Sequence, residues 1–164
     1  MTFRSEHYRI GPAPDAIVLL YTVASGTFEG PQLHLTAVPH TGEEWNRMRG
    51  DGVISLESRH LLSTAAGDLI FATLSGIYDV GDDGYADALE DAIMSNARAE
   101  LTIRFYTAAE DYRWLNRAQF IGLGRRDFAA RTLTLRIFRA RDVSNPDISE
   151  TYIEGSRTYT FPDP

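Results

Sequence analysis

A carboxylate and a guanidinium stand two residues apart in a stretch that reads as a β-strand. Glu57 and Arg59 share one face of that strand, and Leu56 and His60 take the other. If the charged face lines the inside of a barrel, Arg59 could orient an anionic substrate and a desolvated Glu57 could act as the general base. The alternative is a solvated outer face with a weak ion pair, and periodicity alone favours that alternative.

Further aromatic and cationic residues could complete such a site. Tyr112, Trp114 and Asn116 lie within one short segment and could form a pocket wall for a planar ligand. They could equally form an aromatic corner in which Asn116 caps backbone groups. Arg104 lies in an apolar strand, where it could point inward and stabilise a developing oxyanion. The simpler interpretation is that the Arg104 side chain extends back to the surface.

Several classes of chemistry are excluded or disfavoured by composition and spacing. The chain has no cysteine and no lysine, which excludes thiol nucleophiles, iron–sulfur clusters and Schiff-base enzymes. No two histidines have the spacing of metal ligands, so we predict no metal. Gly122 and Gly124 resemble the start of a dinucleotide fingerprint, but Asp127 stands where the third glycine belongs. We therefore predict that the protein uses no cofactor.

Charge and hydropathy restrict the partners. The chain has 23 acidic residues against 16 basic ones and a net charge of -7, which argues against binding to duplex nucleic acid. Its longest apolar run, at residues 16–24, is too short to span a bilayer, and no secretory signal pattern begins the chain. We expect a cytoplasmic protein that binds a small molecule and does not bind membranes. An open sheet edge would make a homo-oligomer plausible.

The elements that must position these residues are mostly short strands. The chain of 164 residues is long enough for one domain, which we place at residues 3–142, with a C-terminal extension at 143–164. Residues 85–98 have one apolar stripe at helical spacing and predict a single helix. We expect a loop carrying Trp45 at 39–52, a turn or short helical bend at 108–117 and an edge strand at 158–161. A β-branched and aromatic run, alternation and turn residues predict strands at 17–23, 33–38, 53–64, 69–80, 101–107, 118–122 and 132–141. This pattern indicates an antiparallel β-barrel or sandwich.

Five segments in order resemble one family. They are residues 25–31 (SGTFEGP), 49–52 (RGDG), 56–60 (LESRH), 112–117 (YRWLNR) and 120–125 (FIGLGR). Together they resemble the domain-of-unknown-function 3237 family over about residues 8–141. The resemblance implies a small antiparallel β-barrel, similar to allene oxide cyclase and other calycin-like barrels. It implies no established reaction.

The resemblance also bears on the site residues. The family usually shows Asp-Ala-Arg-Tyr where this chain has residues 57–60, so the carboxylate and the arginine persist while the aromatic hydroxyl is lost. This persistence favours a lumenal position for Glu57 and Arg59. Asp51, in the second segment, and Trp45 join the expected substrate-binding residues. A family Phe-Arg-Thr segment is replaced near residue 100, which suggests a changed substrate.

The leading hypothesis is therefore a cofactor-independent acid–base enzyme. It would carry out a cyclisation, isomerisation or addition–elimination on a small polyketide-like or phenolic substrate in the barrel lumen. Glu57 would move the proton, and Arg59 and Arg104 would stabilise the oxyanion. Two alternatives are a binding barrel without chemistry, and a structural or interaction module whose barrel is filled by side chains.

Overall fold

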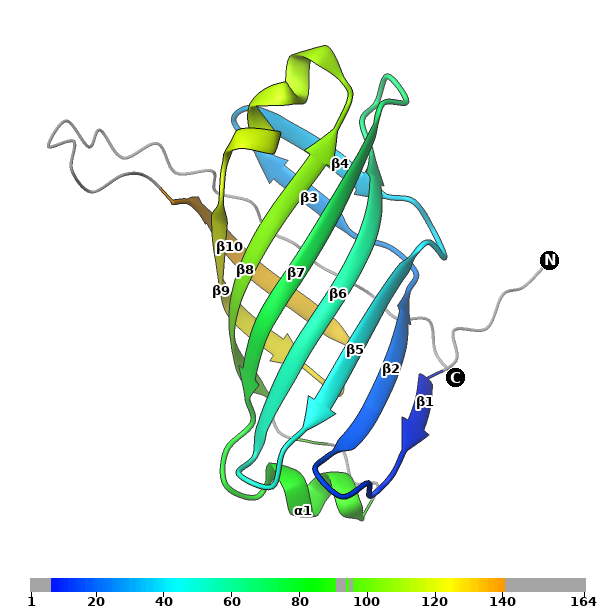
Figure 1. Ribbon diagram of the computed structural model, residues 1–164, viewed down its shortest axis with the longest axis vertical. Helices are drawn as coiled ribbons and strands as arrows, with labels where there is room; N and C mark the ends of the chain where they lie inside the picture. Colours follow the sequence, from blue (N-terminus) through cyan, green and yellow to red (C-terminus); the bar gives the residue numbers. More distant parts are fainter. Residues whose placement is uncertain (1–6, 91–93, 95, 141–164) are drawn as a thin grey trace, which may run out of the picture.

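The fold is a single curled antiparallel sheet with one short helix at one end (Figure 1). The computed structural model describes residues 7–90, 94 and 96–140. Helix α1 spans Gly84–Leu89, and a 3-10 helix spans Glu110–Arg117. The strands are β1 (His7–Ile10), β2 (Ile17–Val23), β3 (Thr27–Gly30), β4 (Leu33–Ala37), β5 (Gly42–Met48), β6 (Val53–Ser63), β7 (Leu69–Asp79), β8 (Ala97–Thr107), β9 (Phe120–Asp127) and β10 (Thr132–Arg139).

The sheet follows the order β1-β2-β5-β6-β7-β8-β9-β10, and the β3–β4 hairpin joins it through β6. Thr36 and Ala37 of β4 pair with the end of β6, beyond Arg59, the last residue of β6 that pairs with β5. Among the described residues the sheet does not close, because no pairing joins β10 to β1 or to β3. The predicted antiparallel β-barrel fold is confirmed as a barrel-like sheet that stays open.

Alternation along the strands separates an inner face from an outer face. Every second residue of β8 is buried from Ala97 to Thr107, and the residues between them are exposed. The inner side chains form one apolar core, because burying them removes apolar surface from water. Phe105 of β8 lies edge-to-face against Phe28 of β3 and Phe120 of β9, with ring centroids 5.8 and 5.2 Å apart. The β3–β4 hairpin thereby covers one end of the core.

Gly124 serves close strand packing. A Cβ built on Gly124 would lie 1.9 Å from the backbone oxygen of Thr134 on β10. A side chain at this position would therefore force the two strands apart.

Two expected elements differ from the structure. The predicted helix at 85–98 is shorter, because α1 ends at Leu89 and Ala97 already begins β8, while residues 91–93 and 95 lie outside the described residues. The predicted loop at 39–52 contains β5. Its inward residues include Glu44 and Asn46, so the apolar alternation that marks a strand is absent there.

Other expectations have simpler outcomes. The bend expected at 108–117 is the 3-10 helix. The expected edge strand at 158–161 and the extension at 143–164 lie outside the described residues. Within the part of the chain that the structure describes, no helix combines the length and the apolar character needed to cross a bilayer.

Candidate functional site

A cluster of polar side chains lies inside the otherwise apolar sheet. It consists of Glu44 and Asn46 on β5, Ser58 and His60 on β6, and Arg126 on β9. All five are buried, and Glu44 and Arg126 are each only 1% exposed. Charged groups are almost never buried to this extent unless they are paired, because they lose their hydration. We call these five residues the inner polar cluster.

Glu44 is held from two directions. The Nδ2 group of Asn46 donates a hydrogen bond of 2.9 Å to Glu44 Oε1. From the β9 side, Arg126 Nη2 lies 3.9 Å from the same oxygen. This separation is an ion pair but exceeds hydrogen-bond length. Asn46 Oδ1 is buried and accepts no hydrogen bond from the described residues. The carboxylate is therefore neutralised without being tightly chelated.

Arg126 lies between two aromatic rings. Its guanidinium carbon is 5.5 Å from the ring centroid of Tyr21 on β2 and 5.4 Å from that of Phe128, just after β9. Both distances fall within the range of cation–π attraction. Tyr21 and Phe128 are only partly buried, so the rings beside Arg126 are in part exposed to solvent.

Ser58 and His60 form a second hydrogen-bonded unit. Ser58 lies directly opposite Glu44 in the β5–β6 register and donates to the backbone oxygen of Glu43 at 3.0 Å. A hydroxyl has one proton, so the contact between Ser58 Oγ and His60 Nε2 requires His60 to donate. A neutral His60 then carries its lone pair on Nδ1. Gly42 makes room for this ring, since a Cβ there would lie 2.7 Å from Nδ1.

The inner polar cluster contains the parts of an acid–base site. A carboxylate and an imidazole can accept or donate protons, and a buried guanidinium can stabilise an anion in surroundings of low polarity. Among the described residues, no three His, Asp or Glu side chains gather as a group that could hold a metal ion.

The lumenal position expected for Glu57 and Arg59 is wrong. Both side chains point outward, and the Arg59 side chain is 64% exposed and paired with Glu43 at 3.5 Å. Leu56 lies on the opposite face of β6 and enters the core. Glu57 consequently lacks the desolvation that a lumenal general base requires.

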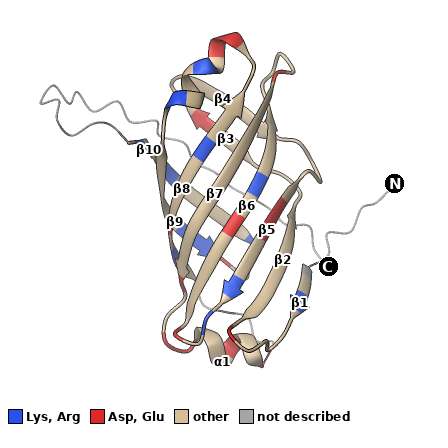
Figure 2. Cartoon of the chain, viewed as in Figure 1, with Lys and Arg blue, Asp and Glu red and all other residues tan. Residues whose placement is uncertain are grey.

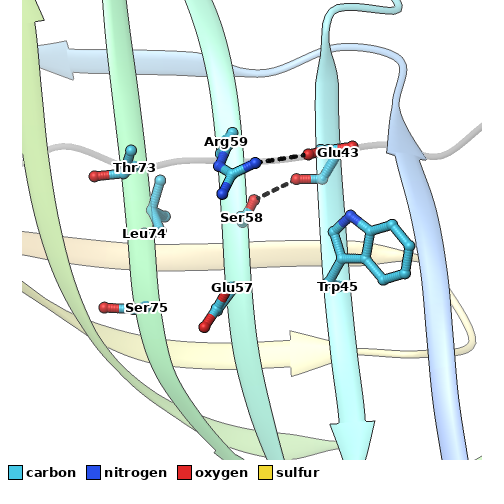
Figure 3. Close-up of a pocket in the computed structure, with 8 residues that line it drawn as sticks. All are labelled: Glu43, Trp45, Glu57, Ser58, Arg59, Thr73, Leu74 and Ser75. Carbon is cyan, nitrogen blue, oxygen red and sulfur yellow. Dashed lines mark hydrogen bonds and ion pairs between the residues drawn. The ribbon is translucent and has the colours of Figure 1, made fainter.

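These two residues instead line an outer groove. Figure 3 shows Glu57 and Arg59 on β6 beside Trp45 on β5, with Thr73 and Ser75 on β7. The groove has a volume of about 450 Å³. Acidic and basic positions occur on both β5 and β6 (Figure 2). The expected grouping of Trp45 with Glu57 and Arg59 therefore occurs, but on the outside of the sheet.

Arg104 and Asn116 line a second outer groove, so the inward orientation considered for Arg104 is also wrong. Asn116 donates to the backbone oxygen of Thr107 and accepts from its N–H, both at 2.8 Å. This is the capping role that the sequence left open for Asn116. Tyr112 and Trp114 pack against the core, and Trp114 meets Phe120 at 6.1 Å between centroids.

Asp51 lies in the exposed turn between β5 and β6, apart from both grooves. It accepts hydrogen bonds from the Arg49 side chain and the Val53 N–H. Desolvation raises the pKa of Asp51, but the hydrogen bonds from Arg49 and the Val53 N–H, together with the positive charge of Arg49, outweigh it and hold the pKa below its ordinary value. Asp51 therefore stabilises a turn.

Sequence reasoning missed Glu44, Asn46 and Arg126. Strand parity could have found Ser58 and His60, since they share the parity of Leu56 and Leu62. No such signal marked Glu44 and Asn46, because polar residues at alternate positions look like an outer face. Arg126 continues the alternation of Phe120 along β9, but its partner on β5 is visible only in three dimensions.

Comparisons with known proteins identify the family and the fold. The chain belongs to the family described as protein of unknown function (DUF3237), whose family model matches residues 1–140. No protein of curated function matches the chain in sequence. The suspected family is thereby confirmed.

Solved structures share the fold at low identity. A protein of unknown function from Clostridium acetobutylicum matches with a TM-score of 0.66 and 16% identity, covering 94% of this chain and 90% of that one. A β-barrel-like protein from Acinetobacter baumannii has a TM-score of 0.61 and 18% identity, covering 94% and 87%. A protein described as an enzyme, from Penicillium herquei, has a TM-score of 0.56 and 18% identity, covering 96% and 84%.

Proposed function

We propose that this member of the DUF3237 family is a cofactor-independent acid–base enzyme whose site is the inner polar cluster. Its substrate would be a small polyketide-like or phenolic molecule. The reaction would be a cyclisation, an isomerisation or an addition–elimination, in which a proton is moved and no group is oxidised or reduced. The proposal keeps the chemistry expected from the sequence and transfers it from Glu57 and Arg59 to Glu44 and Arg126.

One observation carries the proposal: Glu44 and Arg126 are both fully buried, yet they meet at 3.9 Å rather than in a tight bidentate pair. A buried pair that serves stability alone gains most from short, complete hydrogen bonding. A buried carboxylate beside a buried guanidinium supplies the groups that proton transfer and anion stabilisation require. The similarity to a protein described as an enzyme is consistent with this, but at 18% identity it supports only the fold.

Each member of the cluster has a role in the proposed reaction. Glu44 removes or returns the proton, and Asn46 orients its carboxylate through the 2.9 Å hydrogen bond. Arg126 stabilises the enolate or phenolate that forms. His60, held by Ser58, acts as the second proton-transfer group. Tyr21 and Phe128, the two partly buried rings beside Arg126, would be the first side chains that an entering substrate meets.

The test uses phenols that carry their own electrophile, with 2′-hydroxychalcone as the first probe. Its phenolic oxygen can add to its own enone, which gives a chiral ring of unchanged mass. We expect the wild-type protein to yield an excess of one enantiomer on a panel of such compounds. Glu44→Gln should abolish that excess, while Glu57→Gln, an isosteric change on the outer face, should preserve it.

Three results would count against the proposal. Glu44→Gln could leave the enantiomeric excess intact, or Glu57→Gln could abolish it. Alternatively, the panel could bind saturably and be recovered unchanged, which would favour the binding barrel. Circular dichroism of both variants establishes that each is folded before its activity is compared.

A further inference from the structure

The second outer groove combines cations with aromatic surface. It has a volume of about 710 Å³, within the usual range for small-molecule sites. Phe71 and Thr73 on β7 lie directly opposite Tyr106 and Arg104 on β8, and all four line the groove. Arg117, the last residue of the 3-10 helix, lines it from the other side. Two guanidinium groups therefore share one groove with two aromatic rings.

Arg104 is oriented before any ligand arrives. Its Nε donates a 2.8 Å hydrogen bond to Gln119 Oε1. The amide of Gln119 is in turn fixed by bonds from its Nε2 to the backbone oxygens of Ile103 and Phe120, at 3.2 and 3.3 Å. This arrangement uses the Nε edge of the guanidinium and leaves its two terminal nitrogens for another partner. A paired set of terminal N–H groups matches the two oxygens of a carboxylate.

Neither cation of this groove pairs with an acidic side chain of the described residues. Within the described residues, no Asp or Glu side chain lies within ion-pair distance of Arg104 or Arg117. Most other exposed arginines do have one, as Arg59 has Glu43 and Arg113 has Glu110. In a chain with 23 acidic and 16 basic residues, two arginines that line one groove without a carboxylate from the described residues favour an external anion.

The aromatic side chains define the rest of the ligand. Tyr106 is 73% exposed and Phe71 is 40% exposed, although both are large hydrophobic residues. As direct cross-strand partners they present one continuous apolar surface beside Arg104. A planar ring can stack on such a surface while its acidic substituent reaches the guanidinium.

We propose that this groove binds an aromatic carboxylate. The carboxylate lies on the terminal nitrogens of Arg104, with Arg117 as the second cation and the Thr73 hydroxyl as a further donor. The aromatic ring of the ligand rests on Phe71 and Tyr106. The groove lies on the outer face and shares no residue with the inner polar cluster, so this site does not depend on the proposed reaction.

The experiment titrates 2-naphthoate into the full-length protein and follows binding by calorimetry and by ¹⁵N NMR. The side-chain amide of Gln119 and the Nε–H of Arg104 report directly on the groove. We expect saturable binding with a Kd of about 1 mM or below. Neutral 2-naphthalenemethanol should bind at least about tenfold more weakly, because it cannot pair with the guanidinium. Acetate, which lacks the ring, should also bind more weakly.

Matched variants distinguish specific binding in the groove from non-specific electrostatic attraction to the protein. Arg104→Met keeps the apolar stem and should weaken naphthoate binding about tenfold or more. Arg125→Met removes the same charge from an exposed position of β9 that lines neither groove, and it should leave binding unchanged. Tyr106→Ala, at a highly exposed position, should weaken naphthoate but not acetate.

The proposal is overturned by any of three results. These are no saturable binding of naphthoate up to about 10 mM, equal losses in Arg104→Met and Arg125→Met, or shifts confined to residues outside the groove. Loss of the reaction in Glu44→Gln with unchanged naphthoate binding would show that the two sites are separate. Failure of one proposal therefore leaves the other intact.

Discussion

Arg126 of β9 faces Glu44 of β5 across the interior of the sheet, with 3.9 Å between Nη2 and Oε1. The two residues come from strands that are not neighbours in the sheet order. Tyr21, Glu44 and Ser58 occupy successive positions of one row across β2, β5 and β6. The curl of the sheet brings Arg126 over this row, and the pair therefore links opposite walls of the open barrel.

This link should make the two charges energetically coupled. Arg126→Met leaves the carboxylate of Glu44 buried without its cation, and we expect a loss of about 3 kcal/mol in the free energy of unfolding. Glu44→Gln should cost less, because the glutamine still accepts the bond from Asn46. In the double variant, the combined loss should be smaller than the sum by about 1–3 kcal/mol. Urea unfolding of the four proteins measures this coupling, and additive losses would contradict it.

The space beside the His60 ring should allow no side chain larger than that of glycine at position 42. A Cβ on Gly42 would lie 2.7 Å from His60 Nδ1 and 3.0 Å from the Cβ of Val23. Because both neighbours are buried, we expect Gly42→Ala to destabilise the fold by about 1–3 kcal/mol. Gly50→Ala is the matched control, since no atom lies within 4 Å of a Cβ built there. Equal midpoints of thermal unfolding for the two variants would refute this steric argument.

Asn116 should contribute to stability through its two backbone hydrogen bonds. Asn116→Ala leaves the N–H and the oxygen of Thr107 without these 2.8 Å partners. We expect a loss of about 1–3 kcal/mol. Hydrogen exchange at the Thr107 amide should accelerate in the same variant. Arg117→Ala, the next residue of the 3-10 helix, should change the unfolding free energy much less, because its side chain bonds to no described residue.

Acidic pH should weaken the turn that Asp51 holds. Its pKa is lowered in the folded protein, so its contribution is present above the unfolded pKa of about 3.9 and disappears as the pH falls through the folded value. Wild type should therefore exceed Asp51→Asn in stability at neutral pH, and the difference should shrink below about pH 4. Urea titrations between neutral pH and this range measure the trend. In an Arg49→Met background the pH-dependent difference should be much smaller, and an unchanged difference would exclude Arg49 as the cause.

Much of the fold could be predicted from local pattern. The β-branched and aromatic run of Ile17–Val23, the alternation in Leu33–Ala37 and the turn at Gly67 belong to the sequence itself. The family segments added the barrel architecture. The same reasoning failed at β5, where inward polar residues conceal the strand, and at residues 97–98, where strand pairing replaces the expected helix.

The sequence by itself determined which residue types were available for chemistry and which strands would carry them. The alternation along β6 already separates Leu56, Ser58 and His60 from Glu57 and Arg59, and the tertiary structure turns the first set inward and the second set outward. Spacing along the sequence identifies only pairs of charges that are close in the chain, such as Glu57 and Arg59. Only the curl of the sheet brings Arg126 to Glu44, because that contact depends on how distant strands close around a shared interior.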